Sequence, residues 1–316
     1  MQVKKLDNVT ISLDDAVKCT YQGNVTEVLY MEHQNKESVI LRMSGGLYLD
    51  KRSGEIKEIV HMVSRADDKN EIRKTMRRLR ALINCNTADL QKCRWVTLTY
   101  AENMRDSKRL YKDTEKLIKK IRYKFGHFEY IHVAEPQGRG AWHLHCIWIF
   151  DKKAPYIDQH WLAGVWEHGI NVTVKKLDDN DNLGAYLTAY LTDMEYNDYM
   201  RDVLCSQGYS VPEDIDFTSF ISDNSDIPEK EIEIDGVLKK KRFVKGGRLH
   251  LYPPKFNLYR CSRGIKRPTE EYLLYENAQK KIGSGQPTFS SAIQLTDETT
   301  EFSNILIKEY YNSKRG

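Results

Sequence analysis

The sequence predicts an α+β protein in which a central antiparallel sheet is flanked by helices. Between residues 94 and 194 the hydrophobic pattern changes in the order strand, helix, strand, strand, helix, strand, helix. Two of these strands follow each other through one short turn that contains Gly138 and Gly140, which is typical of an antiparallel pair. A doubly wound parallel sheet would instead require a helix after every strand. The pattern therefore favours an antiparallel sheet.

The composition limits the class of protein but names no partner. The 316 residues suffice for one large domain or two modest ones, and 49 basic with 45 acidic residues give a formal charge of only +4. The six cysteines include no CxxC pair, which argues against a zinc ribbon or a disulfide scaffold. The N-terminus lacks the apolar run of a signal peptide, and no segment reaches the roughly 20 apolar residues of a membrane span. We expect a soluble, cytoplasmic protein without a membrane partner.

Residues 1–90 are expected to form an N-terminal accessory segment that could bind DNA. Short alternating runs such as residues 25–30 and 39–43 predict strands, and residues 71–80 predict a helix. Basic residues surround the apolar stripe of this helix, among them Arg73, Lys74, Arg77 and Arg78. These residues are candidates for contacts with the DNA backbone, although a solvated amphipathic face explains them equally well.

Residues 91–210 are expected to form the core domain, because the alternation of strand and helix patterns is regular there. Strands are predicted from β-branched and aromatic runs, and helices from apolar spacing that ends at glycine. The expected elements are, in order, a strand at 94–100, a helix at 106–125, strands at 128–135 and 141–150, a helix at 161–167, a strand at 171–175 and a helix at 182–194.

The remainder of the chain divides into an insertion at 211–245 and a C-terminal extension at 246–316. The insertion begins acidic and ends in a basic run, so we expect part loop and part exposed hairpin. Lys240 and Lys241 in the basic run are further candidates for contacts with the DNA backbone. We expect the extension to pack on the core, with a helix that starts at Thr269 and strands near the C-terminus.

Two histidines in one strand indicate a metal site. His143 and His145 point to the same face of the sheet, and the glycine turn folds the preceding strand back so that Glu135 lies beside them. Two imidazole nitrogens and a carboxylate oxygen can hold a divalent cation and leave positions for water and a phosphate oxygen. We predict Mg²⁺ or Mn²⁺ as the cofactor, with zinc as an alternative. Histidines on the polar side of a half-buried sheet are the competing interpretation, and we assign it to His132 on the neighbouring strand.

Tyr186 and Tyr190 are candidate catalytic residues on the helix that follows. They are four residues apart, so on a helix both phenols point in one direction. Leucines continue the same stripe, and from this segment alone a core position is the preferred interpretation. A nearby cation changes this, because it polarises a phosphodiester and compensates for the weak nucleophilicity of a phenol with a pKa of about 10. Covalent attachment through tyrosine conserves the energy of the broken bond, so that a DNA strand can be rejoined.

Three motifs occur in a characteristic order, namely Trp95-Val-Thr-Leu-Thr-Tyr100, His143-Leu-His145 and Tyr186-Leu-Thr-Ala-Tyr190. Together they resemble the motifs of the HUH endonucleases, specifically the rolling-circle replication initiators (Rep proteins) of bacterial plasmids, integrative elements and phages. The resemblance covers roughly residues 84–268 and implies the RRM-like palm of that superfamily.

The resemblance also implies an activity and a set of partners. A tyrosine would nick single-stranded or hairpin origin DNA through a 5′-phosphotyrosine intermediate and leave a 3′-OH that primes synthesis. A second transfer would end the round of replication. Because the sequence contains no GxxxxGK[ST] phosphate loop, unwinding and synthesis would require a host helicase and a host DNA polymerase.

The chain departs from the resembled pattern at two positions. Relatives usually carry lysine directly before the second tyrosine and three residues after it, where this chain has Ala189 and Asp193. Lys175 and Lys176 on the preceding strand are possible substitutes. The departure leaves open which tyrosine is the main nucleophile. It also leaves open a DNA-binding protein of the same fold with reduced or lost cleavage, or a relaxase or transposase of the same superfamily. Arg139 in the glycine turn is a further candidate for DNA binding.

Overall fold

Strands from both ends of the chain divide the computed structural model into two compact units. The first unit comprises Met1–Val63 and Lys266–Gly316, and the second comprises Ser64–Ile265. The structure describes residues 2–34, 38–59, 69–137, 140–169, 171–179, 182–188, 193–212, 215–220, 227, 229–234, 237–253, 256–283, 285–298 and 301–315. None of the helices in these ranges is both long and apolar enough to cross a membrane.

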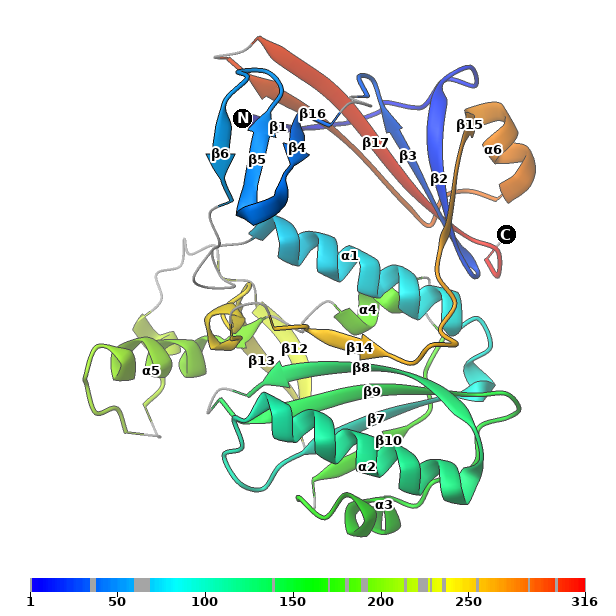
Figure 1. Ribbon diagram of the computed structural model, residues 1–316. Coiled ribbons are helices and arrows are strands. Elements are labelled where there is room, and N and C mark those ends of the chain that lie inside the picture. The colour runs from blue at the N-terminus through cyan, green and yellow to red at the C-terminus, as the bar shows by residue number, and fades with distance from the viewer. Residues whose placement is uncertain are drawn as a thin grey trace. The chain divides into compact units, whose positions relative to one another are not determined.

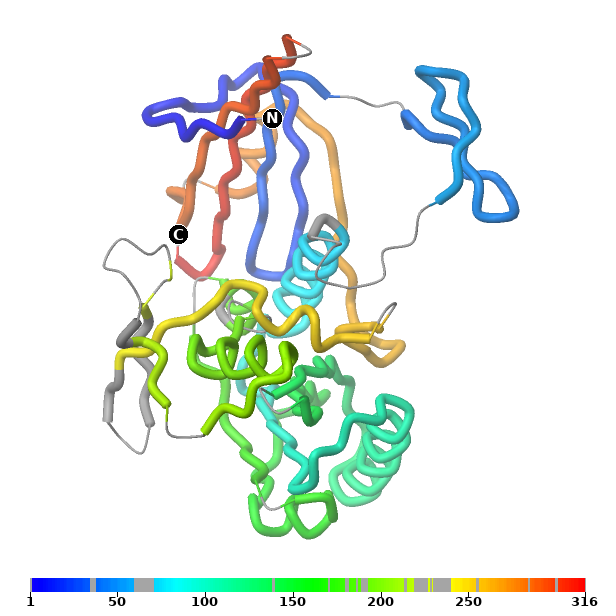
Figure 2. Tube along the Cα trace, turned by 90° about the vertical axis from the view of Figure 1, so that its left-hand side faces the viewer, coloured from blue at the N-terminus to red at the C-terminus, as the bar shows by residue number. Residues whose placement is uncertain are grey.

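The first unit is built on a six-stranded antiparallel sheet to which both ends of the chain contribute. In spatial order its strands are β1 (Gln2–Leu6), β16 (Phe289–Asp297), β17 (Phe302–Asn312), β3 (Val25–Met31), β2 (Ala16–Gln22) and β15 (Thr269–Leu274). Figure 2 shows the blue N-terminal strands beside the orange and red C-terminal ones. Helix α6 (Tyr275–Ile282) contributes Tyr275 and Ala278 to the core. The same unit holds a three-stranded sheet of β4 (Ile40–Arg42), β5 (Leu47–Asp50) and β6 (Ile56–Glu58), with η1 (Ser44–Gly46) between β4 and β5.

This pairing differs from two expectations. Residues 269–274 form strand β15 instead of the start of a helix, because they pair with β2 from the N-terminal segment, and α6 begins only at Tyr275. The division into units also differs from the predicted boundaries at residues 90 and 246. Residues after Lys266 share a sheet with the N-terminal strands, a pairing between segments more than 200 residues apart.

The second unit confirms the predicted fold class. Its central sheet is antiparallel throughout, in the order β10 (Val172–Lys175), β7 (Cys93–Thr99), β9 (Trp142–Phe150), β8 (Phe128–Pro136) and β14 (Tyr259–Cys261). Figure 1 shows α2 (Ser107–Phe125) and α3 (Gln159–Trp166) on one face of this sheet. The other face carries α1 (Lys69–Asn86) and α4 (Leu183–Thr188).

A second, smaller sheet extends this unit. It consists of β11 (Met194–Glu195), β13 (Val237–Val244) and β12 (Glu229–Ile234), so the segment that follows α4 pairs with the end of the hairpin predicted for the insertion. Helix α5 (Tyr196–Ser206) follows β11 directly. Short 3-10 helices complete the unit, namely η3 (Leu90–Lys92), η4 (Phe217–Phe220) and η5 (Leu249–Leu251).

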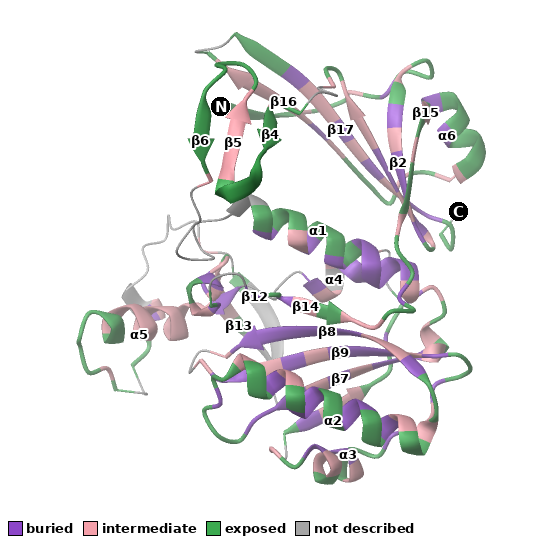
Figure 3. Ribbon diagram, in the orientation of Figure 1, coloured by how far each residue is buried: buried purple, intermediate pink, exposed green. Residues whose placement is uncertain are grey.

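The two faces of the central sheet have different chemistry, which follows from the alternation of side chains along each strand. Leu144, Cys146 and Trp148 of β9 are buried on the α2 side, where Leu144 and His132 line one hollow with Ile118 of α2. His143 and His145 are only partly buried and point to the opposite face (Figure 3). The apolar face therefore anchors the sheet, while the face toward α1 and α4 carries the polar groups.

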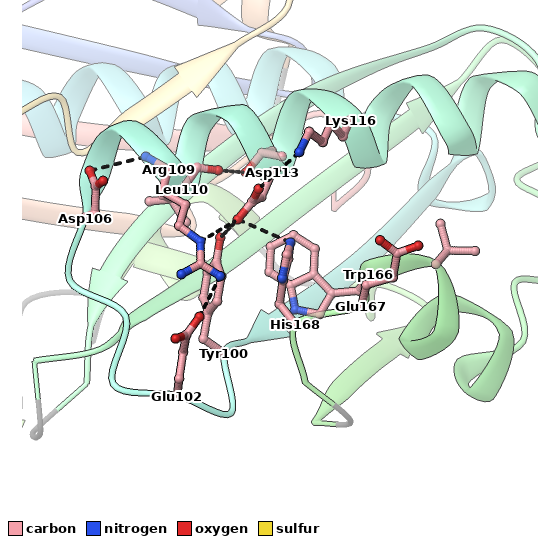
Figure 4. A network of polar contacts seen from close by, with 12 residues as sticks. Tyr100, Glu102, Asp106, Arg109, Leu110, Asp113, Lys116, Trp166, Glu167 and His168 are labelled. Carbon is pink, nitrogen blue, oxygen red and sulfur yellow. Dashed lines mark hydrogen bonds and ion pairs between the residues drawn. The ribbon is translucent and has the colours of Figure 1, made fainter.

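A buried carboxylate fixes the end of β7 on the anchored side (Figure 4). Asp113 of α2 is only 6% exposed and accepts a hydrogen bond of 3.1 Å from the Tyr100 hydroxyl. Its Oδ2 also lies 3.2 Å from Nε2 of His168 and 3.5 Å from Nε of Arg109. Burial and the nearby Asp113 carboxylate raise the pKa of Tyr100, so its hydroxyl stays protonated and donates. This network joins α2 and the segment after α3 to the strand that borders the site.

Candidate functional site

The register of three strands places the predicted acidic and imidazole groups together. Glu135 of β8 pairs with His143 of β9, and His145 pairs with Thr97 of β7, so all of these side chains lie on one face. Oε2 of Glu135 accepts a hydrogen bond of 2.7 Å from Nε2 of His145. The two imidazole rings stack with centroids 4.7 Å apart and an interplanar angle of 20°. The sequence therefore anticipated the position of Glu135 beside the histidines.

Burial keeps both imidazoles uncharged near neutral pH. It lowers the pKa of His143 to about 3, with a smaller contribution from His145, and it lowers the pKa of His145 to about 4. Nδ1 of His143 lies 3.3 Å from Nε2 of Gln137, which donates to it. Nε2 of His143 and Nδ1 of His145 are buried and have no hydrogen-bond partner among the described residues. Neutral imidazoles with unused nitrogens are the form of histidine that binds metals.

An arginine that sequence reasoning missed also reaches this group. Arg248 forms an ion pair with Oε1 of Glu135, the carboxylate oxygen that His145 leaves free. It follows a turn after β13 in which Gly246 has a φ of 70°, a conformation that favours glycine. The sequence signal is the run Lys245-Gly-Gly-Arg248, which places a cation just after a glycine turn.

These groups line one side of a cleft of about 490 Å³. Trp95 stacks on His145 with ring centroids 5.3 Å apart and forms part of the cleft wall. Lys175 and Lys176, which we considered as substitutes for the missing lysines, also line it, as do Leu183 and Leu187 of α4. The remaining lining residues are Glu135, Leu177, Asp178, Asp193, Phe243 and Arg248. The cleft thus combines three basic residues with three acidic residues and an apolar helix face.

Helix α4 is held against α1 by close packing and by hydrogen bonds. Oδ1 of Asn84 accepts a hydrogen bond of 2.7 Å from the Gly184 amide, and Nδ2 of Asn84 donates to Oδ1 of Asn182 at 3.0 Å. Nε of Arg80 donates to Oγ1 of Thr188 at 2.9 Å. A Cβ atom at Gly184 would lie only 2.3 Å from the Arg80 carbonyl oxygen, so glycine permits this approach.

The predicted tyrosines belong to this helix and the residues after it. The backbone of Tyr186 lies within α4, while its side chain and the whole of Tyr190 lie outside the described residues. The described part of α4 is shorter than the helix predicted for residues 182–194, because Met194 belongs to strand β11. Leu183 and Leu187 on either side of Tyr186 line the cleft, so the element that carries this tyrosine borders the imidazole and carboxylate group.

The other predicted DNA-binding residues do not line the cleft as the structure describes it. Arg73, Lys74, Arg77 and Arg78 belong to α1, where Lys74 is exposed and forms an ion pair of 2.7 Å with Glu71. Lys240 is exposed on β13, whereas Lys241 forms an ion pair of 2.6 Å with Glu195. Arg139 lies outside the described residues.

Glu135, His143 and His145 do not form a complete cation cage in the structure. Among the described residues, no group of three or more His, Cys, Asp and Glu side chains is arranged to enclose a metal ion. Arg248 and His145 each satisfy one oxygen of Glu135. The convergence of the carboxylate with the two imidazoles is nevertheless that of a partial ligand set.

Comparisons with known proteins identify one family. Residues 93–195, about a third of the chain, match the model of a family described as Replication-associated protein, of the ORF2 type. The matched segment begins with β7 and ends with β11, so it contains the sheet face, α4 and both tyrosines. Searches among curated proteins and among solved structures each found no significant match. The family match supports a role in DNA replication for this segment.

Proposed function

We propose that this protein is a site-specific endonuclease and strand transferase that nicks and rejoins single-stranded DNA to initiate and end rolling-circle replication. One observation carries the proposal. Glu135, His143 and His145 meet on a sheet face that borders the tyrosine-bearing helix, inside the segment that matches a replication-associated family. The substrate would be single-stranded or hairpin origin DNA, with a host helicase and a host DNA polymerase as partners.

The residues of this face fit a divalent cation. Oε2 of Glu135 and Nε2 of His145 are 2.7 Å apart, close to the separation of about 3 Å between neighbouring ligand atoms around Mg²⁺. Nε2 of His143 is buried and without a partner among the described residues, which makes it available as a third donor. We assign Mg²⁺ or Mn²⁺ to Glu135, His143 and His145. A cation bound there would polarise the scissile phosphate and offset its negative charge.

The chain would perform the bond exchange through a tyrosine. The phenol oxygen of Tyr186 or Tyr190 loses its proton and attacks phosphorus, a new O–P bond forms, and the bond to the 3′ oxygen breaks. The leaving oxygen takes up a proton and becomes the free 3′-OH, while the 5′ phosphate stays on tyrosine. The reverse reaction with a 3′-OH rejoins the strand without another energy source.

The cleft supplies the further requirements of this reaction. Lys175 and Lys176 are exposed at the end of β10, where they can attract a DNA backbone. Trp95 offers an aromatic wall against which a base can stack. The basic residues of α1 and of β13 would contribute to binding outside the cleft.

A binding protein of the same fold without cleavage is the second candidate. It is favoured by Asp193, which occupies a position where the resembled family carries lysine and whose carboxylate accepts a hydrogen bond of 3.2 Å from the Gly246 amide. In that case the site would hold origin or hairpin DNA without cutting it. A relaxase or transposase would share the chemistry and differ in its DNA substrate.

Covalent adduct formation distinguishes these functions. The purified protein is incubated with Mn²⁺ and 3′-labelled single-stranded oligonucleotides that tile both strands of its gene and the flanking DNA. Nicking transfers the label to the protein, and EDTA or the double substitution Tyr186→Phe, Tyr190→Phe is expected to abolish the transfer. Binding of an oligonucleotide without any labelled protein would refute nicking and support the binding protein.

A further inference from the structure

We propose that Arg248 binds the scissile phosphate and replaces the lysine that the resembled family carries near its tyrosines. This inference rests on the proposed function and deepens it. Arg248 lines the cleft together with Lys175 and Lys176, but unlike those exposed lysines its side chain is only 19% exposed. A guanidinium withdrawn from water at the centre of a cleft is placed to hold an anion in a fixed position.

The contact with Glu135 leaves donors of Arg248 for a ligand. A guanidinium has five N–H donors, and a carboxylate oxygen uses only part of them. Oε1 of Glu135 faces Arg248, while Oε2 faces His145. This division allows Glu135 to act at the imidazole side with one oxygen and to orient Arg248 with the other. The remaining donors of Arg248 are then one carboxylate away from the proposed cation, which is where a bridging phosphate would lie.

The segment after the tyrosines holds the turn that carries Arg248. The carboxylate of Asp193 accepts the hydrogen bond from the Gly246 amide, and Met194 pairs with Val244 in the small sheet. A Cβ atom at Gly247 would lie 2.9 Å from Cβ of Met194, so the turn packs directly on β11. The position that is lysine in the resembled family is therefore used here to fix the turn that precedes the arginine.

Lys175 and Lys176 are less suited to this role. Both are exposed at the end of a short edge strand, and a flexible ammonium group in water makes a weak and strongly screened contact. We therefore assign attraction of the DNA to these lysines and the fixed phosphate contact to Arg248.

The test separates a phosphate contact from an orienting role toward Glu135. Binding of a fluorescein-labelled oligothymidylate is measured by anisotropy in EDTA over a range of salt concentrations. Because Arg248→Gln alone leaves Glu135 buried without its partner, the comparison is made between Glu135→Gln and the double variant Glu135→Gln, Arg248→Gln. We expect removal of Arg248 to weaken binding about tenfold and to lower the salt slope by about 0.7, the value of one phosphate contact in single-stranded DNA.

Lys245→Gln in the same turn is the matched control, since Lys245 is exposed and does not line the cleft in the part that the structure describes. We expect this variant to retain the salt slope of the unmodified protein. Equal affinities and slopes for Glu135→Gln and the double variant would overturn the phosphate contact.

Adduct formation by the unmodified protein, measured in parallel, separates the two proposals. Adduct formation together with an unchanged affinity on removal of Arg248 would overturn the role of Arg248 and retain nicking. A loss of affinity without any adduct from the unmodified protein would overturn the proposed nicking and retain Arg248 as a DNA-contacting residue.

Discussion

The packing of α4 against α1 can be tested by adding one methyl group at Gly184. In Gly184→Ala the new Cβ would lie 2.3 Å from the Arg80 carbonyl oxygen and 2.8 Å from Oδ1 of Asn84. Ordinary van der Waals contact begins at about 3.4 Å, so α4 would have to move by roughly 1 Å. The Arg80 contact is with backbone, which cannot rotate away as a flexible side chain could.

Two opposing free energies decide the sign of this substitution. Alanine is favoured over glycine inside a helix by about 1 kcal/mol. Overpacking costs about 1–3 kcal/mol, and weakening the hydrogen bond between Gly184 and Asn84 costs about another 1 kcal/mol. We therefore expect Gly184→Ala to lower the free energy of unfolding of the second unit by about 1–3 kcal/mol. If a tyrosine of this segment is the nucleophile, a displacement of about 1 Å should also reduce the rate of adduct formation by up to about 100-fold.

The measurement is urea unfolding followed by tryptophan fluorescence. All five tryptophans lie in the second unit, so the signal reports on that unit alone. Gly164→Ala in α3 is the control, because a Cβ atom there would meet no atom within 4 Å and the residue is also helical. That variant is expected to gain about 0.5–1 kcal/mol. Stabilisation of the protein by both substitutions would refute the close approach of α4 to α1.

Two further substitutions probe the groups that support the sheet. Asn84→Ala removes the hydrogen bonds to Gly184 and Asn182 and leaves a buried amide without a partner, so we expect a loss of about 1–3 kcal/mol in tryptophan-monitored unfolding. An unchanged unfolding midpoint would contradict the role of Asn84 in anchoring α4. Tyr100→Phe removes the hydrogen bond to Asp113 but retains the ring, so a loss of about 1 kcal/mol is expected in the same assay. No loss would mean that Asp113 is satisfied without the tyrosine hydroxyl.

Local patterns in the sequence were sufficient for the core of the second unit. The alternation in residues 141–150 separates Leu144, Cys146 and Trp148 from the two histidines, and the structure shows this separation as two faces of β9. The glycine turn predicted the pairing of Glu135 with His143, which the register confirms. Both features depend on residues close together in the chain, since side-chain alternation and a short turn are properties of neighbouring residues.

Arg248 and strand β15 could not be found in this way. Arg248 lies more than 100 residues after Glu135, and it reaches that carboxylate only because the turn after β13 is held by the segment that follows α4. Residues 269–274 have a pattern that we took for a helix, and they become a strand because β2 offers an unpaired edge. Intrinsic preferences amount to less than about 1 kcal/mol per residue, so pairing and burial against distant segments override them.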